Sequence, residues 1–176
     1  TVLACAAGLE GAGFAEGDAV LVMGDNRANL YLGMLAAGAL GGYAMPLYPD
    51  AVPDEVRHFA TEVEARFVLA EDQEQVDKIL DLRTGCPCVE HVVYDDPRGV
   101  GRYQAPGLIS WDQLQQRGAQ ALAADAGLAQ QLVERARPDD PAAFIHSSGT
   151  TGRPKGVVWP LPELPAGSRT MLVELL

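Results

Sequence analysis

A ten-residue segment near the end of the sequence has the residue types of a loop that holds phosphate. It reads Ser147-Ser148-Gly149-Thr150-Thr151-Gly152-Arg153-Pro154-Lys155-Gly156. Glycines let backbone N–H groups approach a ligand closely, and successive free N–H groups form a concavity that suits an anion. The hydroxyl groups can donate to phosphate oxygens or reach a magnesium ion, and the lysine adds a compact positive charge.

The surroundings of this segment favour a phosphate site over a solvated linker, the other common role of such residues. Residues 142–145 form a short apolar run that predicts a buried strand. Pro154 stiffens the turn just before Lys155, which is one of only two lysines in the chain, the other being Lys78. A strand followed by a glycine- and hydroxyl-rich loop and a lysine is typical of a phosphate site.

The P-loop of nucleoside triphosphatases is the nearest competing motif. It requires glycine immediately before the lysine and serine or threonine immediately after it. Here Pro154 precedes Lys155 and Gly156 follows it, which disfavours that class. A kinase-like nucleotide- or phosphate-binding module stays open as an alternative.

The rest of the sequence predicts strands that alternate with helices. Apolar runs indicate buried strands at residues 19–23, 43–48, 67–69, 89–94 and 142–146, and helical patterns occupy residues 2–12, 26–39, 53–63, 76–80, 110–114 and 128–133. This alternation predicts an α/β fold with a mostly parallel sheet wrapped by helices. Ligands bind at the carboxyl edge of such sheets, where we expect the loop to lie.

Local signals place several helix boundaries. Asn26 is expected to cap the second helix, and Pro53 suits the first turn of the third. Ser110 and Gln113 have the spacing of a capping box. The last helix is expected to bury three apolar side chains, Leu128, Leu132 and Val133.

Composition excludes several classes of partner. The formal net charge is −11, which argues against nucleic acid, and no apolar run is long enough to span a membrane. Of the three cysteines, Cys86 and Cys88 flank Pro87, a spacing too tight for the usual zinc or redox pairs, so we interpret this pair as structural.

The ten-residue segment resembles, position by position, the signature loop of the adenylate-forming (AMP-binding) superfamily, which includes acyl-CoA synthetases, luciferases and the adenylation domains of peptide synthetases. Residues 17–27 are similar to the start of the large domain of acyl-CoA synthetases, and residues 38–39 followed by residues 44–49 resemble the strand-to-loop segment of these enzymes. Residues 109–114 and 137–142 resemble the long-chain fatty acid–CoA ligase branch. The resemblance covers residues 1–158.

The resemblance implies an N-terminal fragment of an AMP-forming fatty acid–CoA ligase. Such enzymes join a carboxylic acid to ATP as an acyl-adenylate and then to coenzyme A as a thioester, with Mg²⁺. By this resemblance the phosphate contacts come from the residues Ser147, Ser148, Gly149, Thr150, Thr151, Gly152, Arg153, Pro154 and Lys155, with Thr150 also a contact for Mg²⁺. It also implies a cytoplasmic parent protein, with peripheral membrane association.

The resemblance further divides the chain. Residues 1–158 are expected to form part of the N-terminal adenylation domain. Residues 159–176 are proline-rich and atypical, which suggests a truncated or frame-shifted end. The C-terminal domain with its catalytic lysine is expected to be absent, so no catalytic residue is assigned here and the chain alone is expected to be inactive. A non-catalytic remnant is the remaining alternative.

Overall fold

A seven-stranded sheet forms the centre of the fold. The computed structural model describes residues 1–137, 140–147 and 155–160. The strands are β1 (Ala19–Met23), β2 (Tyr43–Leu47), β3 (Phe67–Ala70), β4 (His91–Tyr94), β5 (Leu108–Ser110), β6 (Pro141–Ser147) and β7 (Lys155–Pro160). Their order is β5-β4-β3-β1-β2-β6-β7, and all neighbours are parallel except β6 and β7, which are antiparallel. The predicted fold class is confirmed, although β5 and β7 are not among the expected strands.

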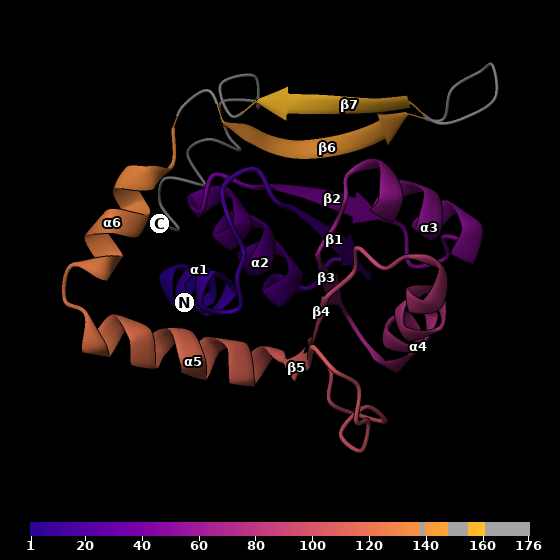
Figure 1. Cartoon of the computed structure of the whole chain (residues 1–176), viewed down its shortest axis with the longest axis horizontal. Helices are drawn as coiled ribbons and strands as arrows, with labels where there is room; N and C mark the ends of the chain where they lie inside the picture. The colour runs from indigo at the N-terminus through magenta and orange to yellow at the C-terminus, as the bar shows by residue number, and fades with distance from the viewer. Residues whose placement is uncertain (138–139, 148–154, 161–176) are drawn as a thin grey trace.

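Helices cover both faces of the sheet (Figure 1). They are α1 (Val2–Gly11), α2 (Ala28–Ala39), α3 (Pro53–Glu62), α4 (Gln73–Leu82), α5 (Trp111–Ala124) and α6 (Leu128–Arg135), with a 3-10 turn η1 (Arg83–Gly85) after α4. One apolar cluster joins α1, α2, α5 and α6 to the sheet, and a second joins α3 and α4 to its other face. In the described part of the chain, no helix combines the length and apolar character needed to cross a bilayer.

The central strands are buried because helices lie on both sides of them. All five residues of β1 and all four of β3 are buried. Both strands are continuous apolar runs without alternation, as expected for a parallel sheet covered on both faces. The prediction of these two strands from the sequence was based on the same apolar runs.

Two glycines allow α1 and α5 to pack closely. A Cβ atom added at Gly118 would lie 1.7 Å from the Ala4 carbonyl oxygen, and one added at Gly8 would lie 2.5 Å from the Leu114 carbonyl oxygen. Real Cβ contacts never approach this closely, so only glycine fits at either position. The backbone of one helix therefore rests directly against the other.

Two of the predicted helix starts are confirmed. Pro53 opens α3, where its missing N–H costs no helical hydrogen bond. At the start of α5 the Gln113 N–H donates to Ser110 Oγ at 3.1 Å, and the Ser110 N–H donates to Gln113 Oε1 at 3.0 Å. These reciprocal bonds form the expected capping box.

Two local predictions are wrong. The N-cap of α2 is Arg27, and its side chain makes no capping bond. Asn26 instead accepts a hydrogen bond from the Tyr31 hydroxyl at 2.7 Å, which occupies the oxygen that a cap would use. Val133 is 50% exposed although the neighbouring Leu132 is fully buried, because successive residues of a helix point about 100° apart.

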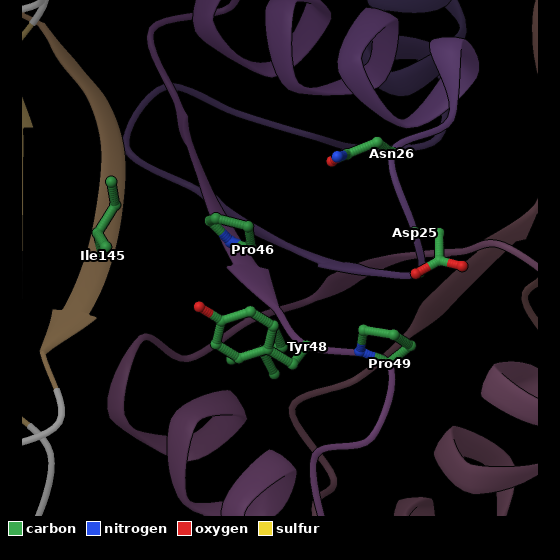
Figure 2. A pocket seen from close by; sticks show the side chains of 8 residues that line it. Asp25, Asn26, Pro46, Tyr48, Pro49 and Ile145 are labelled. Atoms are coloured by element: carbon green, nitrogen blue, oxygen red, sulfur yellow. The ribbon is translucent and has the colours of Figure 1, made fainter.

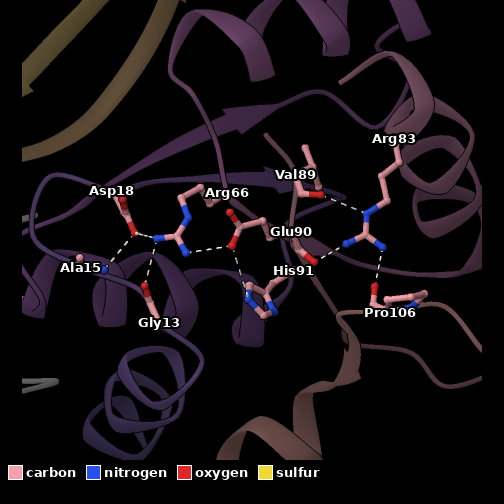
Figure 3. A network of polar contacts seen from close by, with 9 residues as sticks. All are labelled: Gly13, Ala15, Asp18, Arg66, Arg83, Val89, Glu90, His91 and Pro106. Atoms are coloured by element: carbon pink, nitrogen blue, oxygen red, sulfur yellow. Dashed lines mark hydrogen bonds and ion pairs between the residues drawn. The ribbon is translucent and has the colours of Figure 1, made fainter. Parts of the chain in front are cut away.

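Arg66 ties together the loops at the amino edge of the sheet (Figure 3). It lies just before β3 and donates to Asp18 Oδ2 at 3.0 Å, to the Gly13 carbonyl at 3.1 Å and to Glu90 Oε2 at 2.9 Å. Asp18 precedes β1 and Glu90 precedes β4. One guanidinium group therefore holds the entrances of three adjacent strands in register.

Arg83 forms a second link at this edge (Figure 3). Its guanidinium donates to the carbonyl oxygens of Val89 at 3.1 Å, Pro106 at 2.5 Å and Glu90. Burial lowers the pKa of Arg83, although the group remains charged. These bonds join the segment after η1 to the loop that leads into β5.

Candidate functional site at the carboxyl edge of the sheet

The structure brings the two ends of the predicted phosphate loop together. Ser147 is the last residue of β6, Lys155 is the first of β7, and the two are paired across the antiparallel ladder. Seven of the predicted site residues lie outside the described residues: Ser148, Gly149, Thr150, Thr151, Gly152, Arg153 and Pro154. Phosphate binding by this segment therefore stays a prediction.

The position of β6 in the sheet places this segment. β6 is parallel to β2, with Ala143 opposite Ala44, and β2 is parallel to β1. Ser147 therefore leaves the sheet at the carboxyl edge, where β1 and β2 also end. This is the edge at which parallel sheets bind ligands, as the sequence predicted.

A pocket of about 370 Å³ opens at the same edge. Figure 2 shows it between Ile145 of β6 and the loops that follow β1 and β2. Its lining residues are Gly24, Asp25, Asn26, Pro46, Leu47, Tyr48, Pro49 and Ile145. Ile145, two residues before the end of β6, thus contributes to one wall of the pocket.

The pocket combines two large hydrophobic side chains that are exposed with two exposed polar ones, Asp25 and Asn26. Tyr48 is 75% exposed and Ile145 is 40% exposed, although both are large and hydrophobic. No lysine or arginine lies among the lining residues that the structure describes, and Asp25 adds a carboxylate. The large hydrophobic side chains of the pocket suit an apolar or aromatic group.

Glu71 fixes the loop between β1 and α2, which forms another wall. Its carboxylate accepts hydrogen bonds from the Asp25 N–H and from Arg27 Nε, both at 2.6 Å. Burial alone would raise the pKa of Glu71, but these two bonds outweigh it and lower the pKa below its ordinary value. Glu71 is therefore an ionised anchor for the loop.

Glycine is required at the turn into this loop. Gly24 has a φ of 152°, and a Cβ atom there would lie 2.5 Å from Glu71 Cβ. A side chain at this position would push Glu71 away from the Asp25 N–H. The turn and its anchor thus depend on one another.

Acidic residues follow the ends of several strands at this edge. Asp95 follows β4 and accepts a hydrogen bond from Asn29 Nδ2 of α2 at 2.6 Å, and Glu71 follows β3. Neither residue was predicted to belong to the site. The signal was present, because each is the first charged residue after an apolar run that predicts a parallel strand.

The described residues give no support for a metal site of their own. Within residues 1–137, 140–147 and 155–160, no group of three or more histidine, cysteine or acidic residues could hold a metal ion. The expected contact of Mg²⁺ with Thr150 lies outside these residues. The Mg²⁺ site stays a prediction.

Comparison with known proteins gives a consistent result. Residues 1–171 match a family described as AMP-binding enzyme. The chain is 28% identical over 138 residues to a long-chain-fatty-acid–CoA ligase of Xenopus laevis, which covers 78% of this chain and 18% of that protein. It is also 28% identical over 153 residues to 4-coumarate–CoA ligase 4 of Arabidopsis thaliana, covering 87% of this chain and 25% of that protein.

Solved structures agree with the sequence matches. The acetoacetyl-CoA synthetase of Streptomyces lividans is 27% identical and superposes with a TM-score of 0.74, covering 99% of this chain and 26% of that one. An anthranilate–CoA ligase bound to anthranoyl-AMP has the same fold, with a TM-score of 0.73 at 21% identity. The chain spans between 18% and 25% of the length of the two curated relatives above.

Proposed function

Because this chain belongs to the AMP-binding enzyme family, we propose that it is the N-terminal part of an ATP-dependent, AMP-forming acyl-CoA ligase. The parent would convert a carboxylic acid and ATP to an acyl-adenylate and pyrophosphate, and coenzyme A would then displace AMP to give a thioester. The chain spans only a fraction of its relatives, so this activity belongs to the whole protein and the chain alone is expected to be inactive.

The observation that carries the proposal is the position of the ends of the predicted loop. Ser147 and Lys155 are paired at the carboxyl edge of the sheet, beside a pocket with an apolar wall. In our proposal the segment between them binds the β- and γ-phosphates of ATP. An anionic carboxylate must attack an anionic phosphate, so donors and a lysine that stabilise the departing pyrophosphate lower the barrier. Mg²⁺, held in part by Thr150, would share this charge.

We infer a long-chain fatty acid as the substrate. This inference is supported by the match to a long-chain-fatty-acid–CoA ligase and by the sequence resemblance at residues 109–114 and 137–142. The 4-coumarate–CoA ligase at the same identity makes an aromatic acid the alternative to test. We further propose that the parent is cytoplasmic and associates peripherally with membranes, and that residues 1–158 form part of its adenylation domain.

The test is exchange of labelled pyrophosphate into ATP by the parent protein, with and without each acid of a panel. The panel contains long-chain fatty acids, 4-coumarate and acetoacetate. We expect exchange that requires an acid and is fastest with long-chain fatty acids. Exchange without any acid would reject the ligase assignment, and a preference for 4-coumarate or acetoacetate would reject only the fatty acid assignment.

A variant tests the loop separately. Lys155→Ala is expected to slow exchange on the order of 100- to 1000-fold, the usual effect of removing one charge-stabilising donor. Arg57→Ala is the matched control, because Arg57 is also a cation but pairs with Asp54 on α3. Equal exchange rates for the Lys155→Ala variant and the unmodified parent would show that the loop does not bind ATP phosphates.

A further inference from the structure

Two cysteine thiols face one another in the segment that connects η1 to β4. Cys86 is 2% exposed and Cys88 is partly buried, while Pro87 between them is exposed to solvent. The two sulfur atoms lie 3.1 Å apart, and neither forms a disulfide. A disulfide bond measures about 2.05 Å, so closing it requires the two atoms to approach by roughly 1 Å.

Contacts with α3 hold both thiols in this arrangement. The Thr61 hydroxyl lies 3.8 Å from Cys86 Sγ, and Cys88 Sγ donates to the Ala60 carbonyl at 3.6 Å. Both partners lie in the last turn of one helix. The two sulfurs are therefore held against the same short stretch of α3.

Arg83 fixes the backbone on either side of the pair. It is the first residue of η1, and it donates to the carbonyl oxygens of Val89 and Glu90, which directly follow the second cysteine. These bonds link Arg83, which precedes the pair, to the residues after it and so restrain the segment as a loop. Groups held in a fixed geometry react as if at high concentration, which favours bond formation between them.

We propose that Cys86 and Cys88 form a dithiol modification site that closes reversibly to a disulfide when it meets a small-molecule disulfide such as oxidised glutathione. The inference revises our structural interpretation of this pair. It rests on the fold alone and is independent of the proposed ligase activity, since the pair precedes β4 at the amino edge of the sheet.

The reaction has two exchange steps. Cys88, the more exposed thiol, loses its proton and attacks one sulfur of the glutathione disulfide, which releases one glutathione thiolate and leaves a mixed disulfide on Cys88. Cys86 then loses its proton and attacks Cys88 Sγ, which releases the second glutathione. The chain loses two protons and two electrons, that is, two hydrogen atoms in total, and one glutathione disulfide becomes two glutathione molecules.

Cys5 provides an internal comparison. It is fully buried within α1, and burial raises its pKa to about 12. Burial and the neighbouring Cys86 thiol raise the pKa of Cys88 to about 11. The thiols of Cys5 and Cys88 are therefore both mostly protonated at neutral pH. Of these two, only Cys88 is partly accessible to solvent and has a second thiol beside it. We expect slow oxidation at the pair and none at Cys5.

The experiment equilibrates the reduced chain in buffers of reduced and oxidised glutathione, quenches exchange with acid, then unfolds the chain in urea with an alkylating agent so that every free thiol is blocked, and analyses tryptic peptides by mass. The peptide of residues 84–98 contains both cysteines. We expect it to lose two hydrogen atoms and to escape alkylation, while the peptide with Cys5 is fully alkylated. A mixed disulfide that never closes, or closure no more favourable than in the urea-unfolded chain, would overturn the proposal.

Variants separate closure from simple reactivity. With Cys86→Ser we expect the mixed disulfide at Cys88 to accumulate, and with Cys88→Ser we expect little reaction. Arg83→Gln is expected to lower the closure equilibrium about tenfold, while Arg57→Gln, a change of another arginine near Gly85, leaves it unchanged. Circular dichroism identifies any variant that fails to fold. An Arg83→Gln chain that is folded and closes as readily as the unmodified chain would show that the loop geometry has no role.

Discussion

The close packing of α1 against α5 makes a direct prediction about Gly118. Glycine in a helix interior costs about 0.5–1 kcal/mol relative to alanine, so Gly118→Ala would stabilise the chain if the site had room. It has none, because the new methyl group would lie 1.7 Å from the Ala4 carbonyl oxygen and 2.8 Å from the Gly8 nitrogen. Both are backbone atoms, which cannot rotate away as a side chain could.

The magnitude follows from these opposing effects. Overpacking of this kind typically costs about 1–3 kcal/mol, and a clash with rigid backbone belongs at the upper end. Subtracting the gain in helix propensity leaves a net loss of about 2 kcal/mol in the free energy of unfolding. The helices would have to move apart, which exposes apolar surface between them.

Gly38 provides the matched control. It also lies in a helix, α2, but a Cβ atom there would have no neighbour within 4 Å. Gly38→Ala is therefore expected to stabilise the chain by about 0.5–1 kcal/mol. Urea unfolding followed by circular dichroism measures both variants. If Gly118→Ala were as stable as the unmodified chain, or if the two variants changed stability in the same direction, the inferred contact between α1 and α5 would be wrong.

Two other predictions concern the loops at the edges of the sheet. Arg66→Met is expected to lower the free energy of unfolding, measured in urea, by about 1–2 kcal/mol, because three acceptors lose their donor. Arg98→Met is the control and should have little effect, because Arg98 is exposed. Equal effects of the two substitutions would refute the role of Arg66. The pKa of Glu71 is lower in the folded chain than its ordinary value of 4.5, so the ionised Glu71 carboxylate stabilises the fold. This stabilisation is fully present above pH 4.5 and is lost as the pH falls below that value. Urea unfolding between pH 7 and pH 3 should therefore show a smaller loss of stability for Glu71→Gln than for the unmodified chain, and parallel pH profiles would contradict this.

The sequence predicted the sheet well because its central strands are continuous apolar runs. β1 and β3 are buried on both faces, so every residue of each strand is apolar and the strand pattern is unbroken. β5 was missed because it has only three residues and its last one, Ser110, carries the stronger signal of a helix cap. β7 was missed because it begins with a lysine and a glycine and ends at a proline, which are poor strand formers.

The candidate site shows a different limit. Its edge of the sheet could be predicted, because parallel strands bring their carboxyl ends together. The pocket wall could not, since Tyr48 and Ile145 carry no signal that distinguishes a lining residue from a core residue. The anchoring of Asp25 by Glu71 joins residues 46 positions apart, a pairing that only the folded arrangement reveals.

The wrong prediction at Asn26 has a similar origin. Its residue type favours a helix cap, but the Tyr31 hydroxyl competes for the same oxygen. Whether Asn26 caps the helix therefore depends on the position of the Tyr31 side chain in the folded chain. Local preference was overruled by a contact between side chains.

The pairing of α1 with α5 also bears on how the chain folds during synthesis. Ala4 and Gly118 are more than one hundred residues apart, yet their backbones touch. During synthesis, the surface of α1 that packs against α5 stays exposed until α5 has emerged from the ribosomal exit tunnel. Contacts of such long range form slowly and leave nascent chains prone to aggregate. We expect chains that stop before residue 111 to require a chaperone to stay in solution.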